Sequence, residues 1–219
     1  NENRVIQPVM DTHTLPLHPW PQESPRDNFD ETRFRLCWNW LRNPIMDDYS
    51  LTARPGWLRL KGSAFTLDDL ESSTFVGRRQ QHKKCAVSTL LDFKPASENE
   101  EAGLAAYMNE MGHYELVLTV RSSRPALVVR HRIASLVSEV AVKYIDASSP
   151  LELHIIADEE YYHFCYGAEK TELARGLCRY ISTEVAGGFT GVYLAMYASG
   201  NGLPSTRWAD FDYFDYVPA

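Results

Sequence analysis

The chain has 219 residues, of which 44% are hydrophobic and 12% aromatic, and this is enough apolar material for one sizeable core. Its formal net charge is −7 and no basic stripe stands out, so we expect no nucleic-acid partner. No apolar stretch approaches the roughly 20 residues of a membrane span, so we expect no membrane partner.

The first 26 residues differ in character from the rest. Residues 1–10 are predicted to form a short strand, and residues 11–26 form a Pro-rich linker with little periodicity. A compact domain is predicted over residues 27–219. Because the chain starts at Asn1 rather than Met, we expect it to be a fragment or a processed product.

Strand-like segments then recur at short intervals. In chain order they are predicted at residues 34–41, 57–60, 75–82, 84–93, 103–108, 114–120, 126–133, 136–145, 151–157, 161–166, 189–197 and 208–217. Residues 109–112 are predicted to form a hairpin turn, and 114–120 alternates like a half-buried strand. Only residues 171–180 suggest a helix, which Gly176 weakens. The pattern predicts an all-β, two-sheet antiparallel β-sandwich.

The four cysteines are spread along these segments. Cys37, Cys85, Cys165 and Cys178 form no C-x-x-C pair, which argues against a zinc site and favours reduced, buried thiols. Two disulfides stay open if the protein is secreted. The chain opens on no signal-peptide pattern and has no N-x-S/T sequon, so the compartment is undecided, with the cytoplasm favoured over secretion.

Residues 75–82 read Phe-Val-Gly-Arg-Arg-Gln-Gln-His and carry the strongest functional signal. In a strand, Arg78 and Arg79 point to opposite faces, so at most one of them lines a given groove. Arg79 and Gln80 are our candidates for contacts with a hydroxyl-rich ligand such as a sugar, and Arg78 is expected to pair with a carboxylate. A solvated strand face is the alternative.

The segment Trp38-Asn39-Trp40-Leu41-Arg42-Asn43 is a second candidate. Trp38 and Trp40 share a strand face, and Trp40 is assigned to stack on a sugar ring. Arg42 and Asn43 would then supply directional hydrogen bonds. The alternative is that these tryptophans belong to the core.

Two further segments are candidates. Residues 102–109 are mostly small, which lets a ligand approach, and Tyr107 with His113 is assigned to the same groove, although both also suit a structural role. Gly187-Gly188-Phe189-Thr190-Gly191 predicts a permissive loop that holds Phe189 outward, unless the ring tucks back into the core.

The acidic residues indicate a cation rather than catalysis. Asp212, in the acid–aromatic run 210–215, is paired with Asp30 as a candidate Ca²⁺ site, since calcium takes carboxylate oxygens; a solvated strand face is the alternative. No carboxylate pair has the pattern of a sandwich glucanase, and no nucleophile elbow, phosphate loop or dinucleotide fingerprint occurs. We therefore expect no catalytic residue in this chain and no organic cofactor.

Several motifs, taken in order, resemble one family. They lie at residues 38–44, 54–60, 75–82, 102–107, 187–191 and 209–214. From Asp27 to Val217 the chain resembles the C-terminal concanavalin A-like β-sandwich of family 43 glycoside hydrolases, the β-xylosidase and α-L-arabinofuranosidase group. The resemblance implies a concanavalin A-like jelly roll.

The resemblance also implies a partner. Residues 1–10 look like the last strand of the family's catalytic five-bladed propeller. The Asp, Asp and Glu residues that carry catalysis in that propeller are missing here. The segment after residue 10 departs from the family pattern. The implied partners are the propeller of the same protein and a xylo-oligosaccharide or arabinoxylan. By motif, Phe189 corresponds to the loop Phe that reaches the active-site mouth.

Two functions stay open at this point. The first is an accessory domain that stabilises the propeller and supplies Phe189. The second is a stand-alone xylan-binding module, whose groove would consist of Trp40, Arg42, Asn43, Arg79, Gln80, Tyr107 and His113. A lectin-like protein with no enzyme attached is a third reading, and a homo-oligomer is left open.

Overall fold

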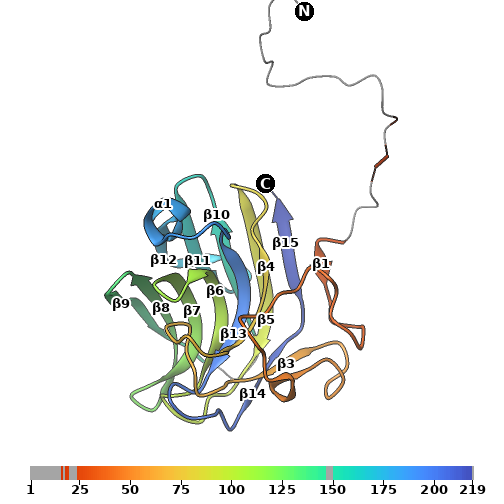
Figure 1. The fold of residues 1–219 in the computed structure, drawn as a ribbon. Coiled ribbons are helices and arrows are strands. Elements are labelled where there is room, and N and C mark those ends of the chain that lie inside the picture. Colours follow the sequence, from red (N-terminus) through yellow and green to blue (C-terminus); the bar gives the residue numbers. More distant parts are fainter. Residues whose placement is uncertain (1–15, 17, 20–23, 147–149, 219) are drawn as a thin grey trace, which may run out of the picture.

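The structure is a computed structural model that describes residues 16, 18, 19, 24–146 and 150–218. The strand predicted at residues 1–10 and most of the linker predicted at 11–26 lie outside the described residues. The remainder folds into two antiparallel sheets packed face to face (Figure 1). The predicted all-β, two-sheet sandwich is therefore confirmed.

The first sheet has nine strands. Its path is β12-β11-β10-β5-β14-β3-β2, and β15 pairs with both β5 and β1. The strands are β1 Arg26–Asp27, β2 Tyr49–Ser50, β3 Leu58–Lys61, β5 Cys85–Asp92, β10 Leu151–Ala157, β11 Tyr161–Tyr166, β12 Thr171–Leu177, β14 Trp208–Phe211 and β15 Phe214–Pro218.

The second sheet has six strands in the order β4-β13-β6-β7-β8-β9. They are β4 Thr74–Arg79, β6 Glu101–Asn109, β7 Gly112–Arg121, β8 Arg124–Ile133, β9 Leu136–Tyr144 and β13 Tyr193–Ser199. The predicted hairpin turn joins β6 to β7. Three one-turn helices complete the described part of the chain: η1 Met46–Asp48, η2 Cys178–Ile181 and α1 Thr183–Ala186. No helix among the described residues is long and apolar enough to cross a membrane.

The main core lies between the two sheets. Period-2 alternation sends every second side chain inward, as in β5, where Cys85, Val87, Thr89 and Leu91 are buried and the residues that alternate with them are half-buried. Leu116 and Phe164 meet them from the other strands and are fully buried. Each such aliphatic or aromatic side chain contributes about 1.5–3 kcal/mol through burial.

The outer face of the six-stranded sheet is covered as well. Residues 62–72, which we call the strap, cross this face and insert Leu67 among Phe75, Tyr107, Val117 and Tyr197, all buried. Both faces of β7 are consequently buried from Gly112 to Thr119. The prediction that 114–120 is half-buried was wrong, because the strap replaces solvent on one side.

Other boundaries also differ from the prediction. Residues 34–41 form turns and bends with a single bridge, Asn39 to Gly77, because Trp38 turns into the core and donates its Nε1 to Asp27 at 2.8 Å. The helix suggested at 171–180 is strand β12 followed by η2. The strand predicted at 208–217 is divided into β14 and β15.

Candidate functional site: the Phe189 loop and its surroundings

Residues 187–192, which we call the Phe189 loop, project from the end of the sandwich that carries α1. Three glycines give the loop left-handed backbone angles, with φ of 79° at Gly187, 79° at Gly188 and 72° at Gly191. Side chains are strained in this region, which explains the glycine spacing. The Phe189 side chain between them is 100% exposed. The prediction that the loop holds this ring outward is confirmed.

The C-terminal side of the loop is anchored on β4. Arg79 donates from Nη2 to the Tyr193 hydroxyl at 2.6 Å and from Nη1 to the Gly191 carbonyl at 3.3 Å, with its guanidinium carbon 4.3 Å from the Tyr193 ring centroid. The Gln80 backbone N–H donates to the Val192 carbonyl at 2.9 Å. Arg79 therefore supports the loop that presents Phe189.

The N-terminal side of the loop is anchored on the β6–β7 turn. Asn109 donates from Nδ2 to the Ala186 carbonyl at 2.8 Å, and its Oδ1 accepts from the Met111 backbone at 3.0 Å. With both ends held, Phe189 is displayed on a braced loop rather than on a free segment. A braced loop loses less conformational entropy when its tip meets a partner.

The neighbouring arginine and glutamine of the 75–82 run face different surroundings. Arg78 donates to the Pro25 carbonyl at 3.1 Å and lies over Tyr216, instead of the expected carboxylate. The expectation that Arg78 and Arg79 point to opposite faces is met. Gln80 accepts from the Tyr162 hydroxyl at 2.6 Å and lines a cavity of about 510 Å³. Ser182, Glu184 and Val192 border the same cavity.

Residues 40–43 run beside β4. Trp40 is half-buried, packs edge-on against Phe34 at a centroid distance of 5.1 Å, and has an Nε1 with no partner among the described residues. Arg42 donates to the Glu71 carbonyl at 3.0 Å and lies 3.6 Å from the Glu110 carboxylate. Asn43 is exposed. Trp40 thus borders the core, while Arg42 and Asn43 border solvent.

Tyr107 and His113 lie beneath the strap. They are 4% and 1% exposed, their rings stack at 5.6 Å, and burial raises the pKa of Tyr107 to about 12. His113 Nε2 is 3.4 Å from both Asp68 of the strap and Glu115. Neither residue offers surface to a ligand in this conformation, because the strap occupies the position assigned to the groove.

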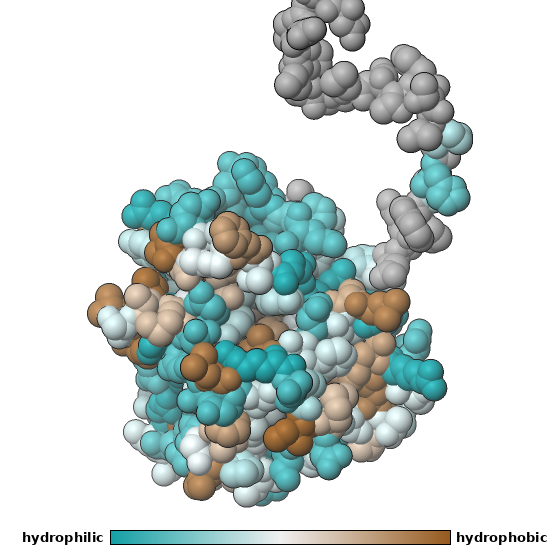
Figure 2. Space-filling model, viewed as in Figure 1, coloured by the Kyte–Doolittle hydropathy of each residue, from teal (hydrophilic) through white to brown (hydrophobic). Residues whose placement is uncertain are grey.

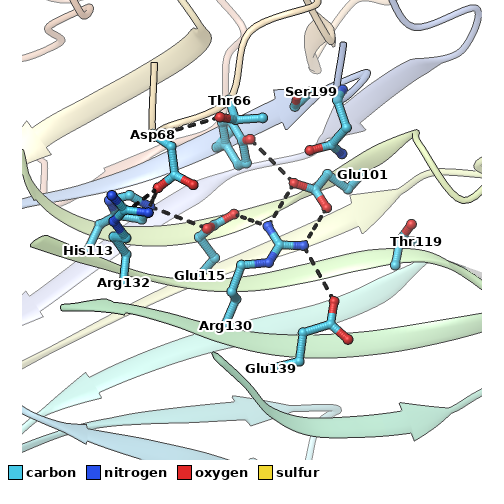
Figure 3. Close-up of polar contacts among 12 residues, drawn as sticks. Thr66, Asp68, Glu101, His113, Glu115, Thr119, Arg130, Arg132, Glu139 and Ser199 are labelled. Carbon is cyan, nitrogen blue, oxygen red and sulfur yellow. Dashed lines mark hydrogen bonds and ion pairs between the residues drawn. The ribbon is translucent and has the colours of Figure 1, made fainter. Parts of the chain in front are cut away.

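An ion-pair network follows the same sheet face (Figure 3). Arg130 bonds Glu101 and Glu115 at 2.9 Å each, and Glu139 lies 3.8 Å away. The positive charge of Arg130 lowers the pKa of Glu115 below its usual value, and this effect outweighs that of burial, which would raise it. For Glu101 the pKa is raised instead, by burial and by the negative charge of Glu115. The sequence did not reveal this network, since only strand register places Glu115 opposite Arg130.

The calcium assignment stays a prediction. Asp30 is exposed and Asp212 is half-buried, with its backbone N–H donating to the Leu90 carbonyl at 3.0 Å. Within the described part of the chain, no group of three or more His, Cys, Asp or Glu side chains is placed to share a metal ion. No disulfide joins the four cysteines, all of which lie among the described residues; Cys85 and Cys165 are buried as expected, whereas Cys37 and Cys178 are half-buried.

The fold and the Phe189 loop define a concanavalin A-like β-sandwich with an outward aromatic loop. The model of the β-xylosidase C-terminal concanavalin A-like domain matches residues 26–217, and the chain belongs to this family. It is 39% identical over 214 residues to the non-reducing end alpha-L-arabinofuranosidase BoGH43B of Bacteroides ovatus, and the aligned region covers 97% of this chain and 40% of that protein. It is 32% identical over 216 residues to the xylan 1,3-beta-xylosidase of a Vibrio species, covering 93% and 39%.

Solved structures agree. One described as Bacteroides ovatus xyloglucan PUL GH43B superposes with a TM-score of 0.91 at 39% identity, over 94% of this chain and 42% of that one. The structure of the xylan beta-1,4-xylosidase of Bacillus halodurans superposes with a TM-score of 0.86 at 28% identity, over 93% of this chain and 41% of that one. The chain therefore spans about two fifths of the length of these relatives.

Proposed function

We propose that this chain is the accessory domain of a glycoside hydrolase of the β-xylosidase or α-L-arabinofuranosidase type, acting on xylan-derived oligosaccharides. In this role it packs on a catalytic propeller of the same protein and stabilises it. Phe189 reaches the mouth of that propeller's active site and shapes it for a terminal sugar. The fully exposed, braced Phe189 is the observation that carries the proposal.

The surface around the loop supports docking of a large partner. Met111 of the β6–β7 turn, Leu136 of β9 and Val185 of α1 are 40%, 71% and 55% exposed at the same end of the sandwich. The β6–β7 turn and the β8–β9 turn lie side by side, because the backbone N–H of Ala134 donates to the Met111 carbonyl at 2.7 Å. Hydrophobic residues interrupt the hydrophilic surface over this end (Figure 2). Exposed apolar groups gathered around a protruding aromatic are typical of a protein interface.

The test is Phe189→Ala in the full-length enzyme. We expect hydrolysis of xylo-oligosaccharides to fall about tenfold or more through misplacement of the terminal sugar. The melting temperature of the present chain alone should stay unchanged, because the ring is solvent-exposed there. Leu203→Ala is the matched control, since Leu203 is 64% exposed and follows β13, whereas Phe189 precedes it. Equal activities of the two variants would remove the proposed role of Phe189.

The stand-alone binding module is not favoured. Two of the seven residues assigned to its groove, Tyr107 and His113, are buried under the strap, and Arg79 is engaged by Tyr193. Titration of the present chain with xylohexaose would revive this alternative if binding were abolished by Arg42→Ala, whose guanidinium borders solvent.

A further inference from the structure

A cavity of about 370 Å³ opens at the end of the sandwich remote from Phe189. Strand β13 begins after the Phe189 loop and ends before the segment that leads into β14, so the two sites lie at opposite ends of one strand. Figure 1 shows α1 and β14 at these opposite ends. The cavity is lined mainly by Arg59, Asp92, Lys94, Arg207, Trp208 and Asp210.

Trp208 supplies a flat aromatic wall. Its neighbours on β14, Ala209 and Phe211, are fully buried, so strand alternation turns Trp208 and Asp210 to the outer face of the nine-stranded sheet. Trp208 is only half-buried, and the Arg59 guanidinium carbon lies 5.5 Å from its ring centroid. A half-exposed indole at the wall of a cavity is suited to stack on the C–H face of a pyranose ring.

The acids of the cavity are already neutralised. Asp210 accepts from Arg59 Nε at 2.6 Å and from Arg54 Nη1 at 2.6 Å, and Arg54 also donates to Asp92 at 2.8 Å. Both acids therefore have a cationic partner, and neither cancels a further positive charge.

Lys94 and Arg207 are the two remaining cations. Both are exposed, and in the described part of the chain neither has an ion pair with an acid. The lining therefore carries three cations, Arg59, Lys94 and Arg207, against the two acids. Just behind it, Arg54 adds a fourth cation and Glu100, which accepts from the Thr206 hydroxyl at 2.7 Å, adds a third acid, so the site has one positive charge in excess in a chain whose net charge is −7. A local positive surplus beside an aromatic wall favours a ligand that combines a ring with a negative charge.

We propose that this cavity binds a uronic acid residue of a glycan. The sugar ring stacks on Trp208, and its carboxylate lies between Lys94 and Arg207. Asp92 accepts hydrogen bonds from ring hydroxyls. The inference goes beyond the accessory role, because the site is remote from Phe189 and holds a charged branch of the polymer. It uses neither Phe189 nor the docking end, so either proposal can fail alone.

The experiment is calorimetric titration of the present chain with two ligands, a xylo-oligosaccharide bearing one glucuronic acid branch and the same oligosaccharide without it. We expect the branched ligand to bind about tenfold more tightly, as one charge-assisted contact predicts. Its affinity should fall as the salt concentration rises. Equal affinity for both ligands, or no binding, would overturn the proposal.

Variants separate a sugar site from a generic anion site. The double variant Lys94→Ala, Arg207→Ala should remove the preference for the branched ligand, and Trp208→Ala should weaken binding of the branched ligand. The matched double control is Arg33→Ala, Lys143→Ala, two other exposed cations, which should bind like the unaltered chain. Thermal unfolding of the cation variants verifies their fold. Competition by acetate as strongly as by glucuronate would show a site for anions alone and contradict the proposal.

Discussion

Arg130 and Glu115 face each other across β8 and β7, with Arg130 Nη1 2.9 Å from Glu115 Oε2. The same guanidinium holds Glu101 of β6, so one cation ties three adjacent strands. Glu101 and Glu115 are 1% and 3% exposed, which leaves Arg130 as their main source of compensation. Buried charges are costly unless they are paired, and this sheet face therefore depends on Arg130.

Replacement of Arg130 by Met should destabilise the domain severely. Two buried carboxylates would lose their partner, and we expect a loss of about 3–5 kcal/mol in the free energy of unfolding, measured by urea denaturation. Arg124→Met is the control, since Arg124 is exposed and stacks on Tyr144. The triple variant with Glu101→Gln and Glu115→Gln should recover part of the loss. A loss below about 1 kcal/mol for Arg130→Met would contradict this account.

His131 should make the domain sensitive to mild acid. Its ring packs on Tyr114 at 4.3 Å, its Nε2 has no partner among the described residues, and burial lowers its pKa from 6.5 to about 4. Above pH 6.5 the imidazole is neutral in both states and no penalty arises. Between pH 6.5 and 4 the unfolded chain takes up a proton that the folded chain resists, so stability falls as the pH falls.

The size of the effect follows from the shift. The lowered pKa of His131 corresponds to a loss of about 3 kcal/mol in the free energy of unfolding at acidic pH, and the partial exposure of the ring reduces this loss to about 2 kcal/mol. His131→Phe should abolish this part of the pH dependence, and urea denaturation at pH 7 and pH 4.5 measures it. Other titrating groups are common to both proteins and cancel in the comparison. Parallel stability curves would exclude His131 as the cause.

The strap should depend on Leu67. This side chain is 1% exposed and packs on the outer face of the six-stranded sheet, against Tyr107 among others. Leu67→Ala should therefore lower the free energy of unfolding by about 2–5 kcal/mol and expose Tyr107. Leu70→Ala in the same strap is the control, because Leu70 is 67% exposed and should change stability by less than about 0.5 kcal/mol. Urea denaturation gives both values. Similar losses for the two variants would mean that the strap is not held through Leu67.

The sequence predicted what depends on local pattern. Alternation located most strands, and the glycine spacing predicted the exposed Phe189. Contacts between segments far apart in the chain were not predictable. The burial of Tyr107 and His113 depends on the strap, some 40 residues earlier, and nothing in either segment indicates that they meet. The same holds for Arg130, whose partners are set by strand register.

Arg79 should act as an anchor of the Phe189 loop. Arg79→Ala removes the bonds to Tyr193 and Gly191, so the amide of Gln80, which donates to Val192, should exchange with deuterium about tenfold faster. Arg78→Ala is the matched control, since this neighbour points to the opposite face and contacts Pro25 and Tyr216. In the full-length enzyme, Arg79→Ala should lower activity in the same direction as Phe189→Ala, and the double variant should add little, because both act through one loop. Unchanged amide exchange in Arg79→Ala would show that the backbone alone holds the loop.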